Sequence, residues 1–195
     1  MRNCCCSDEI LVLPGTGSFT REGISGTLNV TSAGMRGGII QDRFGRRGEE
    51  VVDGMPTRSL PFSVSGAPDG TASYALTLLD YDAIGAVGFL WIHWLAANIR
   101  QPGLPENASV ELRGEFAQGV NSWGAPLLGA GAFEPAAASC YGGMAPPDSP
   151  HRYVLTVYAM DQMLNLRDGF RYHEFLEGIS GHILAAGVLV GIYDN

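Results

Sequence analysis

Short hydrophobic runs bounded by turn residues recur along most of the chain. Runs that are rich in β-branched and aromatic residues predict β-strands. The four clearest candidates are residues 73–79, 88–99, 153–160 and 183–193. Weaker apolar runs lie at residues 10–13, 28–30 and 39–40. The charged run at residues 41–50 is most simply a solvated loop.

One segment near the C-terminus has the spacing of an amphipathic helix. Its apolar positions recur at intervals of three, four and seven residues and are Tyr172, Phe175, Leu176 and Ile179. Asp168 is predicted to cap this helix, and Gly178 and Gly181 to end it. Residues 100–150 are predicted to be mostly loop, and their tryptophan and tyrosine favour an ordered, functional loop over a disordered one.

This order of elements predicts an all-β fold, namely an antiparallel two-sheet β-sandwich of Greek-key type. One or two short helices are expected near the C-terminus. No internal repeat or low-complexity linker divides the 195 residues. We therefore expect a flexible tail at residues 1–9 and a single domain at residues 10–195.

Composition excludes several classes of protein. All twelve basic side chains are arginine. Without lysine there can be no P-loop nucleotide site, protein kinase, Schiff-base enzyme or Ser-x-x-Lys enzyme. The net charge of −8 gives no electrostatic support for binding to duplex nucleic acid or to an anionic membrane.

The cysteines lie in an unusual pattern, with a triplet at Cys4, Cys5 and Cys6 and one further residue at Cys140. A triplet of neighbours is a poor disulfide framework, and there is no Cys-x-x-Cys pair for structural zinc. A lipid anchor on the triplet is an alternative to a reduced, untethered tail. No signal-peptide run and no stretch of about 18 apolar residues is found, so a cytoplasmic protein is expected.

Few polar residues within the predicted strands could carry chemistry. His93 lies inside a strand between tryptophans and is either a satisfied core residue or a pocket residue. Asp80 and Asp82 follow a strand, where they form a turn or point the same way if the extended geometry persists. His151 precedes the next strand and is either a pocket residue or a surface residue at the strand's start. Taken singly, none of these residues indicates a function.

Taken together and in order, these segments form a recognisable pattern. The motifs are SLPFSVSGAPDGTASYALTLLDYDA (residues 59–83), HW (93–94), YGGMAPPDSPHRYVLTVYAMD (141–161) and GHILAAGVLVGIY (181–193). They resemble the phosphatidylethanolamine-binding protein family, and most closely its bacterial, Raf-kinase-inhibitor-like branch. The resemblance runs from about residue 10 to residue 193, which is nearly the whole chain.

The resemblance implies a surface pocket that binds phosphate-like or carboxylate ligands. The implied ligand-binding residues are Asp80, His93, Gly143, Pro146, Pro147, His151 and Tyr153, with Asp82, Trp94 and Tyr141 as further candidates. Imidazoles can donate to anionic oxygens, and the backbone of residues 141–143 could offer N–H groups. An aromatic wall from Tyr153 or Trp94 would suit an ammonium group on the same ligand.

The sequence departs from the family pattern in three places. Tyr81 and Ile84 replace both prolines of the family's Asp-Pro-Asp-Ala-Pro turn, which leaves the turn less rigid. Val64 replaces a tryptophan of the family. The chain also lacks the long C-terminal helix of eukaryotic members, so access to the pocket should differ and a homodimer partner could cover that edge.

The main functional hypothesis is a binding protein for a small anion, such as phosphate, phosphoethanolamine or a carboxylate, with a regulatory or inhibitory role towards a kinase or serine protease. The alternatives are a hydrolase of a phosphoester or acyl substrate, in which Asp80, His93 and His151 act as acid and base or hold a metal, and an orphan β-domain. Catalysis, a cofactor and a bound metal are not expected. Because the pocket relies on histidines, its affinity for anions should be weak and should fall above about pH 6.5 if their pKa values are unperturbed.

Overall fold

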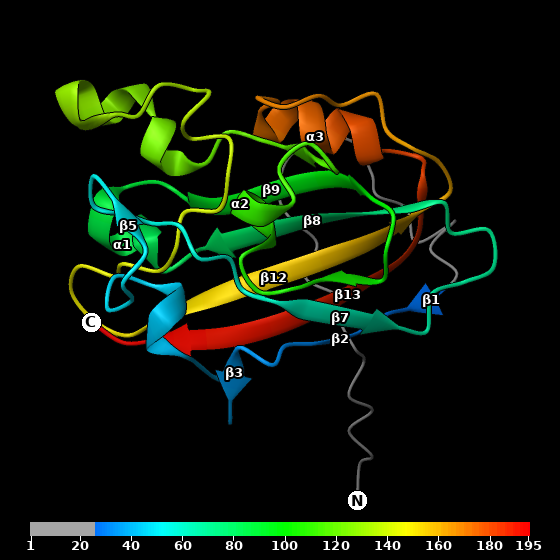
Figure 1. Cartoon of the computed structure of the whole chain (residues 1–195), viewed down its shortest axis with the longest axis horizontal. Helices are drawn as coiled ribbons and strands as arrows, with labels where there is room; N and C mark the ends of the chain where they lie inside the picture. Colours follow the sequence, from blue (N-terminus) through cyan, green and yellow to red (C-terminus); the bar gives the residue numbers. More distant parts are fainter. Residues whose placement is uncertain (1–25) are drawn as a thin grey trace, which may run out of the picture.

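The structure, a computed structural model, describes residues 26–195. Four long strands form its centre, in the order β9-β8-β12-β13, each antiparallel to its neighbour (Figure 1). They are β8 (Ser73–Asp80), β9 (Trp91–Ile99), β12 (His151–Met160) and β13 (Ile183–Tyr193). These are the four strands that the sequence predicts, although β9 begins at Trp91 rather than at residue 88 and β12 begins two residues early, at His151. The predicted tail, its cysteine triplet and the apolar run at residues 10–13 lie outside the described residues.

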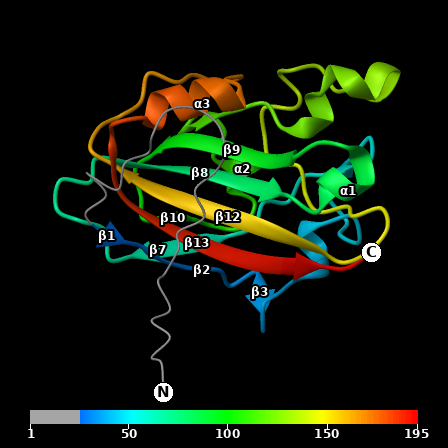
Figure 2. The same ribbon diagram turned by 180° about the vertical axis from the view of Figure 1, so that it is seen from behind.

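Strand β8 lies inside the fold, and both of its faces are covered. All eight of its residues are buried. Side chains alternate between the two faces of a strand, so Leu76 and Leu78 join the larger of two hydrophobic clusters and Ala75 joins the smaller. The smaller cluster includes Phe175 and Ile179 of helix α3 (Tyr172–Ile179), which covers that face of the sheet (Figure 2).

The mainly-β class is confirmed, but the prediction of a purely antiparallel sheet is wrong. The large sheet has the order β11-β9-β8-β12-β13-β4-β3, and β1 also pairs with β13. Both β1 and β4 run parallel to β13. These strands have two residues each, too few for period-two alternation to show their direction. The two-residue strands of the large sheet are β1 (Gly26–Thr27), β3 (Met35–Arg36), β4 (Ile39–Ile40) and β11 (Ala117–Gln118).

A three-stranded sheet with the order β10-β7-β2 and a two-stranded pair, β5-β6, complete the strands of the described chain. Val30 and Phe62 of the small sheet belong to the same hydrophobic cluster as Leu76 and Leu78 of the large one. A two-sheet sandwich with Greek-key connections stays a prediction. The strands are β2 (Asn29–Thr31), β5 (Val51–Val52), β6 (Met55–Pro56), β7 (Phe62–Ser65) and β10 (Gly103–Leu104).

The C-terminal helix is confirmed, but its predicted cap is wrong. The N-cap of α3 is Arg171, whose N–H donates to the Glu174 carboxylate at 2.7 Å. Asp168 instead accepts a hydrogen bond from the Gln118 backbone. Gly178 lies inside the helix, and a side chain there would contact Leu166. Helices α1 (Ala83–Val87) and α2 (Ala108–Glu111) were not predicted, since neither is long enough to show helical periodicity.

Two predicted loops have different outcomes. Residues 100–150 are mostly loop, with short 3₁₀ turns η2 (Ser122–Gly124) and η3 (Pro126–Gly131). The charged run at residues 41–50 is only partly solvated, because η1 (Asp42–Phe44) buries Phe44 completely. No helix in the described part of the chain is long and apolar enough to cross a membrane.

Candidate functional site

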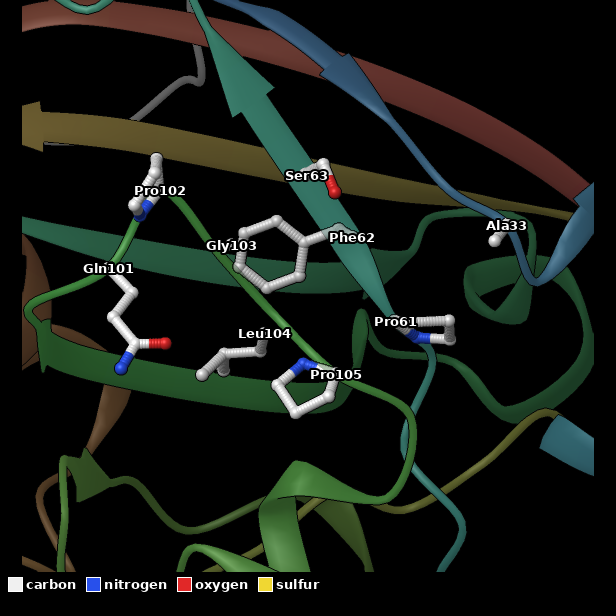
Figure 3. A pocket seen from close by; sticks show the side chains of 9 residues that line it. All are labelled: Ala33, Pro61, Phe62, Ser63, Gln101, Pro102, Gly103, Leu104 and Pro105. Carbon is white, nitrogen blue, oxygen red and sulfur yellow. The ribbon is translucent and has the colours of Figure 1, made fainter.

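Among the cavities on the described surface, two differ in the chemistry of their lining. The larger, of about 390 Å³, lies beside β7 and β10 and has no ionisable side chain in its lining (Figure 3). The smaller, of about 260 Å³, lies at the end of the large sheet where β8 finishes and β12 begins. It is lined by Gly54, Asp80, Ala83, Val87, Trp91, His93, Trp123, Ala145, Pro146, Pro147, His151 and Tyr153. The smaller cavity is therefore the candidate site.

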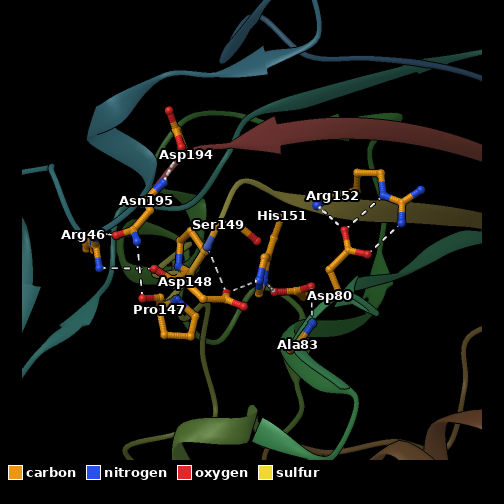
Figure 4. Close-up of polar contacts among 12 residues, drawn as sticks. Arg46, Asp80, Ala83, Pro147, Asp148, Ser149, His151, Arg152, Asp194 and Asn195 are labelled. Carbon is orange, nitrogen blue, oxygen red and sulfur yellow. Dashed lines mark hydrogen bonds and ion pairs between the residues drawn. The ribbon is translucent and has the colours of Figure 1, made fainter. Parts of the chain in front are cut away.

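The pairing of β8 with β12 brings three of the predicted residues together. Tyr153 lies directly opposite Asp80, and His151 is two residues before Tyr153, so all three side chains share one face of the sheet. His151 Nδ1 donates to Asp80 Oδ2 at 2.7 Å, and the Ala83 N–H donates to Asp80 Oδ1 at 3.0 Å (Figure 4). Asp80 thus fixes the orientation of the His151 ring.

The other nitrogen of the His151 ring also meets a carboxylate. Its Nε2 lies 2.9 Å from Asp148 Oδ1, in the loop before β12. A carboxylate only accepts, so this pair of contacts favours the imidazolium form, in which both ring nitrogens donate. Burial lowers the pKa of His151, but the hydrogen bonds to Asp80 and Asp148 outweigh it and the pKa is raised overall. His151 is consequently the buried cation of the site.

His93 reaches the cavity through an irregularity in β9. In the pairing with β8, Trp91 is opposite Asp80 and Trp94 is opposite Leu78, and a shift in register between them leaves His93 as the extra residue of a β-bulge. Bulges of this kind re-aim side chains and recur beside active sites. The bulge places the His93 ring edge-on to Tyr153, with 5.0 Å between the ring centroids.

The two histidines carry different charges. His93 Nδ1 donates to the Gly142 carbonyl oxygen at 2.6 Å, because a carbonyl only accepts. Burial lowers the pKa of His93 to about 4, against the weaker opposing effects of its backbone contacts and of Asp80. The ring is therefore neutral at pH 7, and its Nε2 carries a lone pair. This corrects the expectation that both imidazoles donate to an anion.

Three buried polar atoms of the cavity lining have no hydrogen-bond partner within residues 26–195. They are His93 Nε2, Trp91 Nε1 and the Tyr153 hydroxyl oxygen. Leaving such atoms unpaired costs about 1–3 kcal/mol each, and most native proteins pair them. The tryptophan is a donor, the histidine nitrogen an acceptor and the hydroxyl either, so together they offer a set of contacts to a polar ligand.

Aromatic rings form the remaining wall. Trp91 and Trp123 meet edge-to-face with 4.9 Å between ring centroids, and Trp123 also contacts His93. Sequence reasoning missed both tryptophans as lining residues. Trp91 lies on the cavity face because it is directly opposite Asp80, and that register has no signal in the sequence. Trp123 comes from the long loop, where no periodicity exists to place it.

Four of the predicted residues lie outside the cavity lining. Trp94 points into the core nearer the centre of the sheet, where its Nε1 donates to Gln118 at 2.9 Å. The Tyr141 hydroxyl donates to the Phe44 carbonyl at 2.7 Å. Asp82 does not continue the strand, since it is the N-cap residue of α1, and its carboxylate pairs with Arg152.

The fourth residue, Gly143, serves close packing, because a Cβ there would lie 2.3 Å from the Phe44 carbonyl oxygen. The expectation of free N–H groups in this segment is wrong. The N–H of Tyr141 donates to Ser109, that of Gly142 to His93 and that of Gly143 to Pro56. By contrast, the other six predicted residues line the cavity, and their role in binding a ligand stays a prediction; they are Asp80, His93, Pro146, Pro147, His151 and Tyr153.

Metal binding was the basis of one alternative hypothesis. Among the described residues, no three His, Cys, Asp or Glu side chains are arranged to hold a metal ion. The contacts explain this, since His151 directs both nitrogens at carboxylates and His93 directs one at a carbonyl.

A β-fold with a small polar and aromatic cavity at one end of its sheet defines a ligand-binding class of protein, and comparison with known proteins places it in a family. Residues 30–194 match the family model described as phosphatidylethanolamine-binding protein. The chain belongs to the phosphatidylethanolamine-binding protein family, in its bacterial branch, as the sequence motifs predict.

Similarity to individual proteins supports this assignment to the family. The chain is 42% identical to YxkA of Bacillus subtilis over 75% of this chain and 88% of that protein. It is 34% identical to a UPF0098 protein of Methanothermobacter thermautotrophicus over 80% and 91%. Among solved structures, CT736 of Chlamydia trachomatis, described as a homologue in this family, has a TM-score of 0.68 and 28% identity over 88% of this chain and 99% of that one. Escherichia coli YbcL has the same TM-score at 23% identity over 87% and 99%, which shows the shared fold.

Proposed function

We propose that this protein binds a small phosphate-like anion in the cavity at the end of the large sheet. The observation that carries the proposal is the combination of one buried imidazolium, His151, with two donors that have no partner among the described residues, Trp91 Nε1 and the Tyr153 hydroxyl. A buried cation and preorganised donors stabilise an anion more strongly than the same groups in water. The name of the family, which refers to a lipid with a phosphate in its headgroup, agrees with this chemistry.

The neutral His93 narrows the class of ligand. Its Nε2 accepts a hydrogen bond, so it favours a ligand oxygen that still carries a hydrogen, such as that of a singly protonated phosphate or of a neighbouring hydroxyl group. A cavity of about 260 Å³ suits a headgroup rather than a whole lipid. The aromatic rings of Trp91 and Trp123 suit an attached ammonium group. Phosphate and phosphoethanolamine are therefore the probes to use.

The test is a titration of inorganic phosphate and of phosphoethanolamine, followed through the ring resonances of the histidines. We expect the His93 and His151 signals to move, and a His151→Gln variant to bind about tenfold more weakly, the ratio that corresponds to 1.4 kcal/mol. His182→Gln is the control, because that ring is partly exposed and paired with Asp161. Unmoved His93 and His151 signals at saturating phosphate contradict the proposal.

A hydrolase is not proposed. Among the cavity-lining residues of the described chain there is no serine, threonine or cysteine that could act as a nucleophile. Inhibition of a kinase or serine protease, a homodimer and a cytoplasmic location stay predictions from the family resemblance and the composition.

A further inference from the structure

The loop before β12 places a carboxylate on the buried cation of the site. Asp148 has a side chain that is 57% exposed, yet its Oδ1 lies 2.9 Å from Nε2 of a histidine that is 2% exposed. Pro147 and Pro150 flank the loop at this point, and proline restricts the backbone. The contact is therefore held in a stiff loop at the rim of the cavity (Figure 4).

The two carboxylates on His151 are not equivalent. Asp80 is buried and holds Nδ1 while also accepting from the Ala83 N–H, so it cannot leave without exposing unpaired buried groups. Asp148 faces solvent, and its other contact is with the N–H of the adjacent Ser149. Rotation of one exposed side chain releases it. Nε2 is thus the His151 donor that a ligand can reach, and Asp148 holds it.

We propose that Asp148 is a built-in competitor that occupies the position of the ligand's anionic oxygen on His151 Nε2. This inference rests on the proposed function, since it assumes that the cavity binds an anion. An incoming phosphate must displace the Asp148 carboxylate and also approach its negative charge. Asp148 thereby keeps Nε2 of His151 paired in the free protein and weakens binding, so that only a ligand with a stronger charge or with further contacts to Trp91 and Tyr153 replaces it.

The experiment compares inorganic phosphate binding to the full chain, Asp148→Asn and Asp194→Asn by calorimetry at one ionic strength. Asparagine keeps the size of Asp148 and an oxygen that accepts from Nε2, so the loop should keep its conformation. Asp194 is an exposed acid next to Asn195, whose side chain contacts the Pro147 carbonyl, and no contact between Asp194 and His151 is drawn in Figure 4. We expect the Kd for phosphate to fall about tenfold in Asp148→Asn, and less than about twofold in Asp194→Asn.

Each outcome decides between the two proposals. Equal affinity in the full chain and Asp148→Asn overturns the competitor role but leaves the anion site standing. Weaker binding in Asp148→Asn also overturns it, because Asp148 would then assist the ligand. If Asp194→Asn gains as much affinity for phosphate as Asp148→Asn, the effect comes from net charge alone, and the competitor role is again overturned. If none of the three proteins binds phosphate or shifts its histidine resonances, the anion site itself is wrong, and the competitor role falls with it.

Discussion

Two groups of buried polar side chains lie on the same face of the large sheet, and they differ in how completely they are paired. Beside the edge strand β11, Trp94 and Ser109 both donate to the Gln118 side-chain oxygen, and Gln118 Nε2 donates back to the Ser109 carbonyl. The Tyr141 N–H completes the group by donating to the Ser109 hydroxyl. We call this group the Gln118 network.

At the sheet end, a few residues away, the cavity residues leave polar atoms unpaired. His93 is the chain neighbour of Trp94, yet its Nε2 has no partner in the described chain, and neither has the Tyr153 hydroxyl. The side chains named in both groups are buried, so burial alone does not distinguish the two groups. Hydrogen bonding distinguishes them. A network in which every polar atom is paired stabilises the fold, whereas unpaired polar atoms around a cavity are available to a ligand.

The largest expected effect on stability comes from opening the Gln118 network. In Gln118→Leu, the Trp94 Nε1 and the Ser109 carbonyl lose their partner inside the core, and the Ser109 hydroxyl loses the acceptor of its hydrogen. We expect the free energy of unfolding to fall by about 4 kcal/mol, measured by urea denaturation. The affinity of the folded variant for phosphate should not change.

The matched control is Gln162→Leu, which alters a surface glutamine whose side chain, among the described residues, contacts the partly exposed ring of His182. It should change the free energy of unfolding by less than about 0.5 kcal/mol. A similar loss in the free energy of unfolding for the two variants would show that the Gln118 network contributes no more than a surface contact. Full pairing would then not mark a group that stabilises the fold.

The sequence predicts the strands well where the pattern is long. Residues 183–193 agree with β13 at both ends, whereas the two-residue strands β1 and β4, whose pairing makes the sheet mixed, have no pattern of their own. The same limit applies to the site. Asp80, His93 and His151 were found through family motifs, but the bulge that turns His93 into the cavity depends on the register between two strands. Asp148 has no signal in the sequence beyond being next to Pro147.

A second prediction uses the pH dependence of stability at His93. Its folded pKa is about 4, below the ordinary value of about 6.5, because burial disfavours the charged ring. The unfolded chain therefore binds the extra proton first as the pH falls. The stability tied to the neutral ring is complete above pH 6.5 and is lost between pH 6.5 and 4, by on the order of 3 kcal/mol.

The measurement is urea denaturation at pH 7 and pH 4.5 of the full chain, His93→Gln and His182→Gln. Glutamine can still donate to the Gly142 carbonyl but does not titrate, so His93→Gln should lose about 2.4 kcal/mol less between the two pH values. His182→Gln should follow the full chain. A His93→Gln variant that loses as much stability as the full chain would show that His93 takes up its proton without cost.

The smallest expected change in stability is at Tyr153, and it is the most direct test of the comparison. Tyr153 and Tyr141 are both fully buried tyrosines, but the Tyr141 hydroxyl donates to the Phe44 carbonyl and the Tyr153 hydroxyl has no partner among the described residues. Tyr141→Phe should therefore lower the free energy of unfolding by about 1–2 kcal/mol and leave phosphate binding intact. Tyr153→Phe should change stability by less than about 0.5 kcal/mol, because it removes a hydroxyl that is already unpaired within the described chain, and should weaken phosphate binding about fivefold to tenfold.

Urea denaturation and phosphate titration of the two variants give opposite results if hydrogen bonding distinguishes the structural group from the ligand-binding group. If Tyr153→Phe instead costs stability and spares binding, the unpaired hydroxyl belongs to the core and not to the ligand site.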